Sequence, residues 1–297
     1  MTVLRGLWKH DFPMSQLASW RAGGVAEALF IPADLTDVGT FCHEDPRAGN
    51  ALFVGHGSNL LVRDGGIGGV VVRTAPGLCA MRQEDDLIYV EAGVGCPKLA
   101  KFAAAAGFAD AAFFAGVPGT IGGALSMNAG CHGSETWQHV KQALVFNDGK
   151  RALHDACDFE TGYRSVRFKN GDTPFFAAAW LHFVQGNITV ARSRVRDLLR
   201  RRAQTQPLGE PSCGSVFRNP PDGTAAAALI ESCGLKGRAI GGAMVSHKHA
   251  NFIVNTGGAN AADIENLIVL VQSEVAAQTG VMLNTEVRIV GRKKTDD

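Results

Sequence analysis

Two glycine-rich stretches are the part of this sequence that could do chemistry through the backbone alone. The longer one reads AGVPGTIGGA over residues 115–124 and continues to Asn128-Ala-Gly130, with almost no charge. The shorter one, Gly55-His-Gly-Ser-Asn-Leu60, lies upstream. Glycine lets the chain turn sharply and bring bare N–H groups against a ligand. Two such loops suit a long anionic ligand held by main-chain contacts, such as the pyrophosphate of a dinucleotide.

Neither loop matches the common nucleotide-binding fingerprints. The first lacks the third glycine of G-x-G-x-x-G, and no G-K-[ST] sequence occurs in the chain. A Rossmann nicotinamide site and a P-loop are therefore disfavoured. An ordinary tight turn after a strand would explain the first loop by itself. A second loop of similar density in a separate α/β segment favours a ligand between them.

The bulk composition limits the class of protein. With 297 residues, 46% of them hydrophobic and 19% charged, the chain is expected to be globular and to form more than one domain. Its net charge of +1 predicts no general attraction to nucleic acid or to anionic membranes. No apolar run reaches the roughly 18 residues that span a bilayer, and the start of the chain does not resemble a secretory signal. We expect a cytoplasmic protein without a nucleic-acid or membrane partner.

The cysteines are scattered and odd in number, which argues against a disulfide framework and a metal site. We expect reduced thiols that fill apolar space. They are Cys42, Cys79, Cys96, Cys131, Cys157, Cys213 and Cys233.

The elements that must position the loops follow from the hydrophobic pattern. Residues 28–31, 51–54 and 70–72 are predicted strands, and residues 34–41 a helix, so the first loop follows a strand end, where α/β folds place ligands. A domain boundary is predicted near Gln206-Pro207. Further strands are predicted at 87–92, 141–146, 177–183, 251–255 and 287–290, and further helices at 97–106, 189–202, 225–232 and 263–279. The last helix is expected to start within Ala261-Ala262-Asp263 and to end at the C-cap Gly280.

Four other segments complete an ordered pattern with the loops. They are Trp20-Arg-Ala-Gly-Gly24, Tyr163-Arg164, PSCGSVFRNP over residues 211–220 and NTEVR over residues 284–288. Together with SHKHANFIVN over residues 246–255, they resemble the UDP-N-acetylenolpyruvoylglucosamine reductase family of flavoenzymes from about Ser19 to Gly291. The short connection between Arg164 and Pro211 resembles the family's type II branch, which lacks a substrate-covering loop that carries a tyrosine.

The resemblance implies an α+β protein. Residues 1–74 and 75–203 would form the two subdomains of an FAD-binding fold of the vanillyl-alcohol-oxidase type. Residues 204–297 would form a C-terminal α/β substrate-binding domain. The implied activity is reduction of the enolpyruvyl group of UDP-N-acetylglucosamine enolpyruvate to UDP-N-acetylmuramate in peptidoglycan precursor synthesis. NADPH would be the reductant, FAD the non-covalent cofactor, and the protein a monomer.

The resemblance also implies three catalytic residues. Arg164 would hold the substrate carboxylate and spread the negative charge that hydride addition creates. Ser215 would donate the proton that quenches it. Glu286 would polarise the substrate or relay the proton, and we expect it to be protonated or paired with a cation there. From the residues alone, Arg164 would be a surface arginine, Ser215 a loop hydroxyl and Glu286 a member of a cross-strand ion pair.

The implied binding residues lie in the same motifs. Tyr163, Arg202 and Asn219 would bind substrate, and the diphosphate would also attract Arg218 and the neighbouring Arg200 and Arg201. A helix end whose arginines are solvated is the alternative for the arginine run. The FAD ligands implied are Gly55, Gly57, Ser58, Asn59, Leu60, Gly116, Pro118, Gly119, Thr120, Gly123, Asn128, Ala129 and Gly130.

Three positions depart from the family pattern. His56 stands where another glycine is usual, Ser19 replaces a threonine, and Val166 takes the place of a serine after Tyr163-Arg164. Two rival functions remain open. One is an oxidase of the same fold with covalently tethered flavin, for which His56 and Cys131 are the positions to check. The other is a flavin- or nucleotide-binding module without turnover, which retention of the catalytic residues disfavours.

Overall fold

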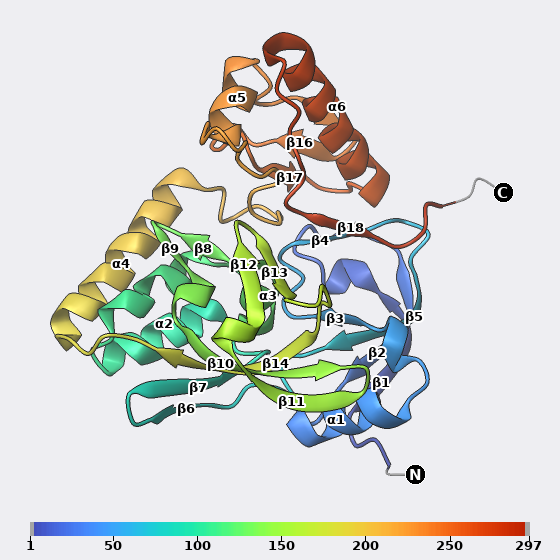
Figure 1. Cartoon of the computed structure of the whole chain (residues 1–297). Helices are drawn as coiled ribbons and strands as arrows, with labels where there is room; N and C mark the ends of the chain where they lie inside the picture. The colour runs from blue at the N-terminus through green and yellow to red at the C-terminus, as the bar shows by residue number, and fades with distance from the viewer. Residues whose placement is uncertain (1–2, 295–297) are drawn as a thin grey trace. The chain divides into compact units, whose positions relative to one another are not determined.

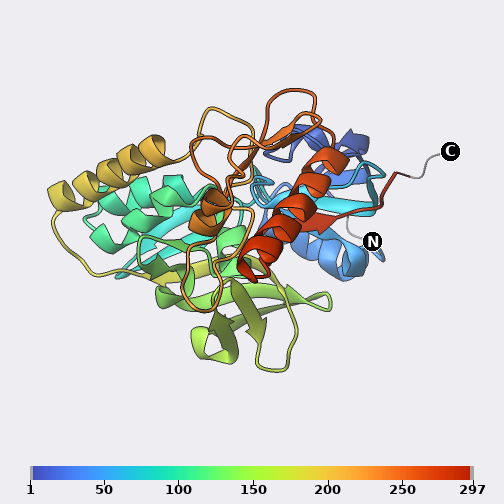
Figure 2. The same ribbon diagram turned by 90° about the horizontal axis from the view of Figure 1, so that it is seen from above.

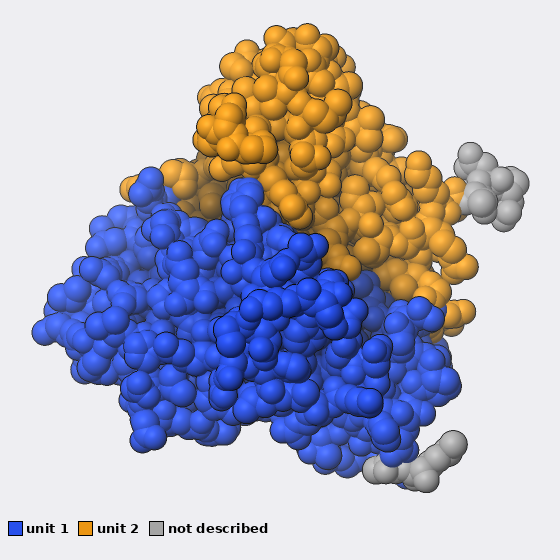
Figure 3. Space-filling model, viewed as in Figure 1, with its two compact units in different colours: residues 1–10, 28–56, 69–201 blue, residues 11–27, 57–68, 202–297 orange. Residues whose placement is uncertain are grey.

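The computed structural model describes residues 3–294, and the chain folds into two compact units (Figure 3). Unit 1 comprises residues up to 10, 28–56 and 69–201, and unit 2 comprises 11–27, 57–68 and those from 202 onward. The three-part division at 74/75 and 203/204 stays a prediction. The chain passes from unit 1 to unit 2 after residue 201, close to the predicted boundary at Gln206-Pro207.

The first sheet contains four strands in the order β1-β2-β5-β3 (Figure 1). Helix α1 (Leu35–Glu44) begins at the cap residue Asp34, whose carboxylate accepts the Asp37 N–H at 2.9 Å. Its apolar face packs with Phe30 of the sheet in one hydrophobic cluster. The strands are β1 (Leu7–Pro13), β2 (Val25–Ile31), β3 (Leu52–Val54) and β5 (Ile67–Arg73).

Unit 1 also contains a five-stranded antiparallel sheet in the order β11-β10-β14-β7-β6. Two helices, α2 (Cys96–Ala105) and α4 (Ile188–Thr205), lie side by side in both ribbon views and bury their apolar faces in the same core (Figure 2). The strands are β6 (Met81–Glu84), β7 (Leu87–Glu91), β10 (Val140–Asn147), β11 (Lys150–Asp155) and β14 (Phe175–His182).

Shorter elements complete unit 1. The 3-10 helix η3 (Ala109–Gly116) leads into α3 (Ile121–Met127), and β8 (Gly130–Cys131) pairs with β9 (Ser134–Glu135). A separate hairpin joins β12 (Phe159–Gly162) to β13 (Ser165–Phe168).

In unit 2, α5 (Ala226–Ser232) and α6 (Ala261–Thr279) pack around a three-stranded antiparallel sheet (Figure 1). Trp20 is fully buried in this core, and its Nε1–H donates to the Ile253 carbonyl at 2.7 Å. The strands are β15 (Ala239–Ile240), β16 (Ala243–Val245) and β17 (Ile253–Asn255), and a separate parallel pair is β4 (Leu60–Val62) with β18 (Arg288–Val290). Short 3-10 helices elsewhere are η1 (Met14–Gln16), η2 (Ala48–Asn50), η4 (Thr136–Gln138) and η5 (Ala156–Asp158).

The strands and helices predicted from periodicity are confirmed, with end differences of a few residues. Helix α6 begins at Ala261, within the predicted start over residues 261–263, and Asn260 caps it in a reciprocal capping box with Asp263. Its predicted end at Gly280 is confirmed by a left-handed residue of φ 73°. Helix α3 and the β12–β13 hairpin were not predicted.

Candidate functional site

The two glycine loops meet inside unit 1. Gly55, at the start of the first loop, lies so close to Thr120 of the second loop that a Cβ atom there would overlap the Thr120 Oγ1 atom. Thr120 is 2% exposed. Gly55 is therefore required for loop-to-loop packing, and the loops that the sequence could only list separately are neighbours.

The second loop fits an extended ligand at one glycine in particular. The Ile121 N–H donates to the Val94 carbonyl and the Gly122 N–H donates to the Ala92 carbonyl, each at 2.9 Å. A Cβ atom on Gly122 would overlap the Ala92 side chain. By contrast, nothing lies within 4 Å of a Cβ atom placed on Gly123. The loop thus packs inward through Gly122 and leaves bare backbone at Gly123, where a ligand such as a flavin dinucleotide can approach closely.

Arg164 occupies the turn of the β12–β13 hairpin. Tyr163 and Arg164 are the two residues between the paired Gly162 and Ser165. Arg164 has φ +55°, a left-handed conformation that glycine adopts far more easily than a side-chain-bearing residue. Its Nη2 donates to the Gly130 carbonyl at 3.0 Å, and its Cζ lies 5.1 Å from the centre of the Tyr163 ring. The structure therefore brings the predicted catalytic arginine to the end of the second loop.

Asn128 connects that hairpin to the loop. It ends α3 with φ +43°, and its side-chain amide accepts the Trp137 N–H at 3.1 Å. The Nδ2 group donates to Glu135 Oε2 at 2.9 Å and to the Gly162 carbonyl at 3.1 Å. These protein contacts engage both ends of the amide, so the predicted contact of Asn128 with FAD would have to come from its backbone.

Other glycines of the second loop are needed for packing. A Cβ atom on Gly116 would lie 2.6 Å from Cys131 Sγ, and one on Gly130 would overlap the Ser134 carbonyl. The Cys131 thiol donates to the Phe113 carbonyl at 3.2 Å. These contacts fix the loop on both sides of the bare backbone at Gly123.

The end of the first loop belongs to unit 2 and contacts Glu286. Asn59 Nδ2 donates to the Glu286 carbonyl at 3.1 Å, and the Arg288 N–H donates to the Asn59 carbonyl at 3.0 Å. Leu60 follows as the first residue of β4 and pairs with Arg288 of β18. The side chain of a predicted FAD ligand is thus bonded to the main chain of a predicted catalytic residue across 227 positions of sequence.

Ser215 lies beside Glu286 in the same unit. The Glu286 N–H donates to the carbonyl of Val216, the next residue after Ser215, at 2.7 Å. Gly214, on the other side of Ser215, has φ +74° and open space where a side chain would be. Burial raises the pKa of the neighbouring Cys213 thiol to about 12, so it stays a thiol at neutral pH and is a poor nucleophile.

The predicted substrate-binding residues are dispersed. Asn219 and Arg202 belong to unit 2: the Asn219 Oδ1 atom accepts the Ala226 N–H at 3.0 Å and holds the start of α5, and Arg202 Nε donates to Gln206 Oε1 at 2.8 Å. Tyr163 is 47% exposed in unit 1, and Arg200 pairs with Asp197 at 3.3 Å. Arg164 belongs to unit 1, whereas Ser215 and Glu286 belong to unit 2.

His56 lies at the contact between the first loop and the turn that follows β7, with its Cε1 atom 3.3 Å from a Cβ position on Gly95. Burial, and secondarily the charge of Arg73, lower the pKa of His56. The imidazole is therefore neutral near pH 7 and offers a hydrogen bond in place of a positive charge.

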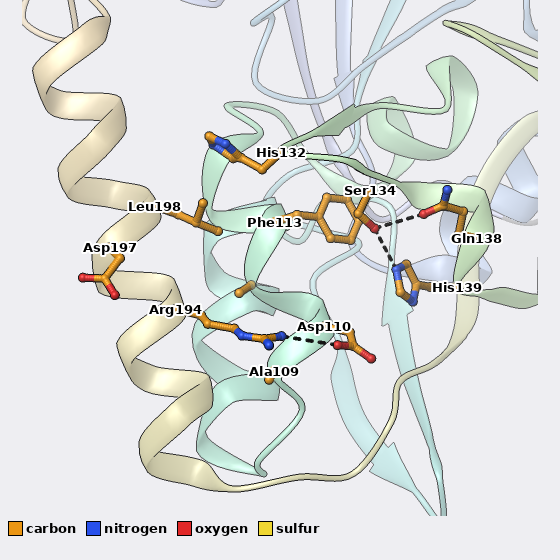
Figure 4. A pocket seen from close by; sticks show the side chains of 11 residues that line it. Ala109, Asp110, Phe113, His132, Ser134, Gln138, His139, Arg194, Asp197 and Leu198 are labelled. Atoms are coloured by element: carbon orange, nitrogen blue, oxygen red, sulfur yellow. Dashed lines mark hydrogen bonds and ion pairs between the residues drawn. The ribbon is translucent and has the colours of Figure 1, made fainter.

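A cavity of about 430 Å³ that sequence reasoning missed lies between η3 and α4 (Figure 4). Arg194 and Asp110 approach each other at 3.6 Å across it, and Ser134 bonds to His139 Nε2 at 3.0 Å. Burial lowers the pKa of His132 and His139, so both rings are neutral near pH 7. Its lining residues come from segments far apart in sequence, which no local pattern could assemble.

Within residues 3–294, no group of three or more His, Cys, Asp or Glu side chains is arranged to hold a metal ion. Over the same residues, every helix is too short or too polar to cross a bilayer.

Comparison with known proteins agrees with this geometry. Residues 26–151 match the family described as FAD binding domain, and residues 206–290 match the UDP-N-acetylenolpyruvoylglucosamine reductase, C-terminal domain. The chain is 49% identical to UDP-N-acetylenolpyruvoylglucosamine reductase of Alkalilimnicola ehrlichii, covering 98% of this chain and 97% of the relative. It is also 49% identical to the enzyme of that name from Methylococcus capsulatus, covering 97% and 94%.

A solved structure supports the same fold. The crystal structure of UDP-N-acetylenolpyruvylglucosamine reductase from Thermus caldophilus superimposes with a TM-score of 0.81 at 29% identity, covering 97% of this chain and 99% of that one. The expected α+β architecture with an FAD-binding portion and a C-terminal substrate domain is confirmed. The chain therefore belongs to the UDP-N-acetylenolpyruvoylglucosamine reductase family of flavin-dependent oxidoreductases.

Proposed function

We propose that this enzyme uses NADPH and non-covalent FAD to reduce the enolpyruvyl group of UDP-N-acetylglucosamine enolpyruvate, giving UDP-N-acetylmuramate. Family membership supports the substrate, and the bare backbone at Gly123 beside the loop contact of Gly55 with Thr120 supports the cofactor. The observation that carries the proposal is the hydrogen bond of Glu286 N–H to Val216, which fixes Glu286 beside Ser215.

When bound, FAD supplies the hydride that NADPH provides and the substrate receives at C3. The protein's own residues must then stabilise the negative charge that hydride addition creates and deliver a proton to C2. The Arg164 guanidinium offers a planar, permanently charged fork for a carboxylate on which negative charge builds up. Its place in a tight hairpin turn, held by Gly130, limits its freedom before substrate binds.

Ser215 supplies the proton to C2. A hydroxyl is a weak acid in water, yet the carbanionic centre that it meets is strongly basic, so the transfer runs downhill. Glu286 acts on the same region as a neutral acid or as part of a cation pair, since an unpaired carboxylate would repel the developing negative charge. Arg202, Tyr163 and Asn219 bind the substrate away from the reacting carbons.

The test separates the two half-reactions under anaerobic conditions. NADPH alone is expected to bleach the flavin absorption, and added enolpyruvyl substrate to restore it with formation of the lactyl ether. Acid precipitation is expected to leave the flavin in the supernatant. A yellow pellet would indicate covalent attachment of the flavin and favour an oxidase. Reduced flavin that is not reoxidised by the enolpyruvyl substrate would refute the substrate assignment.

We also infer that the enzyme is a monomer and that it is cytoplasmic, the second of which its scattered cysteines support. Light scattering coupled to size exclusion tests the first part, with a mass near 31.4 kDa expected for one chain.

A further inference from the structure

Asn251 is a buried amide that the proposed chemistry does not use. Its side chain, 4% exposed, pairs with the main chain of Phe217 at both ends. The Phe217 N–H donates to Asn251 Oδ1 at 2.9 Å, and Asn251 Nδ2 donates to the Phe217 carbonyl at 2.8 Å. The Asn251 carbonyl also accepts the Val216 N–H at 2.9 Å. One residue therefore makes three hydrogen bonds to the dipeptide that directly follows Ser215.

The same dipeptide is held from its other edge by the segment that contains Glu286. The Glu286 N–H donates to the Val216 carbonyl at 2.7 Å, and the Arg218 N–H donates to the Asn284 carbonyl at 2.9 Å. Phe217 and Thr285 form a short antiparallel bridge, and Asn251 bonds to the opposite edge of the Val216-Phe217 segment. On the other side of Ser215, Gly214 has φ +74° and contributes no side chain. Before Gly214, the buried Cys213 thiol bonds to the Gly57 and Leu60 carbonyls, so Ser215 is held from both sides, and its contacts on the C-terminal side are those of Val216 and Phe217.

We infer that Asn251 is a positioning residue, which sets the placement of the Ser215 hydroxyl relative to Glu286 for proton delivery. The inference rests on the proposed function, because it assumes that Ser215 gives the proton. Asn251 does not touch the reacting atoms; it acts through the backbone of Val216 and Phe217.

The chemistry of the contact requires an amide. The side-chain oxygen must accept from the Phe217 N–H while the side-chain nitrogen donates to the Phe217 carbonyl. An asparagine amide does both and does not ionise. An ionised aspartate has the same shape but sets an acceptor against the Phe217 carbonyl. Asn251→Asp is therefore a nearly isosteric change that converts one of the three bonds into a repulsion.

Asn255 provides a matched control. It is also buried, lies on β17, and bonds through its amide to main-chain groups: Nδ2 donates to the Trp20 carbonyl at 2.9 Å, and Oδ1 accepts from the Gly257 N–H at 2.9 Å. Asn255→Asp makes the same chemical change in the same unit without touching Val216 or Phe217. It controls for loss of stability.

The experiment measures both half-reactions of the FAD-loaded enzyme. Asn251→Asp is expected to slow flavin reoxidation by substrate about tenfold to 100-fold, since a misplacement of about 1 Å has effects of that size. Flavin reduction by NADPH, flavin content and substrate KM are expected to change little. The solvent isotope effect on reoxidation is expected to increase, because the proton step becomes more limiting. Asn255→Asp is expected to leave both half-reactions near wild type.

A double variant tests whether Asn251 acts through Ser215. Ser215→Ala combined with Asn251→Asp is expected to be no slower than Ser215→Ala alone. Multiplied defects, or normal reoxidation in Asn251→Asp when Ser215→Ala is slow, would overturn the inference. Normal reoxidation in Ser215→Ala would instead refute the proton-donor role in the proposed function. If Asn251→Asp does not fold, Asn251→Ser is measured in its place against the same predictions.

Discussion

Arg164 illustrates at the scale of one residue how function can oppose stability. Its φ of +55° places a long side chain where a glycine would be relaxed. The hairpin keeps this arrangement because Arg164 Nη2 bonds to Gly130 and Asn128 bonds to Gly162. An arginine at such a turn position is understandable if its guanidinium takes part in the reaction.

We therefore expect Arg164→Gly to be more stable to denaturant than Arg164→Ala by about 1 kcal/mol, because both lose the side-chain contacts and only alanine keeps the backbone strain. Both variants should lose most of their activity. Urea midpoints and steady-state turnover check this. Equal stability of the two variants would show that the turn holds no strain.

Ser215 gives a second prediction at this scale. Ser215→Ala should spare flavin reduction by NADPH and slow the reaction of reduced enzyme with substrate by about 10²–10⁴-fold, because only the second step needs the proton. Stopped-flow absorbance of the flavin resolves the two steps. Ser215→Cys serves as a control that retains a proton donor, and an equal loss in both steps would remove Ser215 from this role.

Glu286→Gln keeps the size of the side chain and removes its acid. Turnover should fall much more than substrate binding weakens, because in the proposed mechanism Glu286 acts on the charge that develops during the reaction. Steady-state kcat and substrate Kd from flavin difference spectra separate the two effects. Unchanged turnover would exclude Glu286 from the catalytic residues.

At the scale of elements, an ion pair fixes the strand that follows the first loop to the last long helix. Arg63, just after β4, forms a two-pronged contact with Glu265 of α6, with Nε 2.9 Å from Oε2 and Nη2 2.9 Å from Oε1. Asp64 beside it accepts the N–H groups of Ala261 and Ala262 at 2.9 Å, at the start of α6. Both contacts lie within unit 2.

This pair predicts a pH dependence. The hydrogen bond and charge of Arg63 lower the pKa of Glu265 below its ordinary 4.5. A depressed carboxyl pKa contributes stability above the unfolded value, and this contribution is lost as the pH falls through the folded pKa. Wild type should exceed Glu265→Gln in unfolding free energy by up to about 1 kcal/mol near pH 7, with the gap closing below about pH 4.5. Urea unfolding of both proteins from pH 3 to 7 measures it; a gap that is constant with pH would contradict the prediction.

At the scale of the whole molecule, cofactor binding should raise stability by mass action. FAD at about 100 times its Kd should add about 2.7 kcal/mol to the unfolding free energy of the apoprotein. The apoprotein, prepared by acid extraction, can be melted with FAD and with riboflavin. Riboflavin lacks the pyrophosphate that the glycine loops suit, so it should raise the Tm less. An equal rise with both would show that the loops do not bind the pyrophosphate.

The sequence by itself determined the family, the glycine loops and most long elements. Helices α1 and α6 were predictable because an apolar stripe and a local end signal, Asp34 at the start of α1 or Gly280 at the end of α6, act within a few positions of each other. Helix α3 escaped prediction because Gly122 and Gly123 have low helix propensity, and packing of Gly122 on Ala92 holds it in place.

Only the tertiary structure decided which distant residues became neighbours. The contact of Gly55 with Thr120, the bond of Asn59 to Glu286 and the pairing of Asn251 with Phe217 join segments that no local pattern relates. Each depends on buried backbone groups finding partners, and that requirement is satisfied by the folded chain as a whole. Residue type therefore indicates the chemistry that a side chain can perform, and long-range hydrogen bonds determine which residues lie next to it.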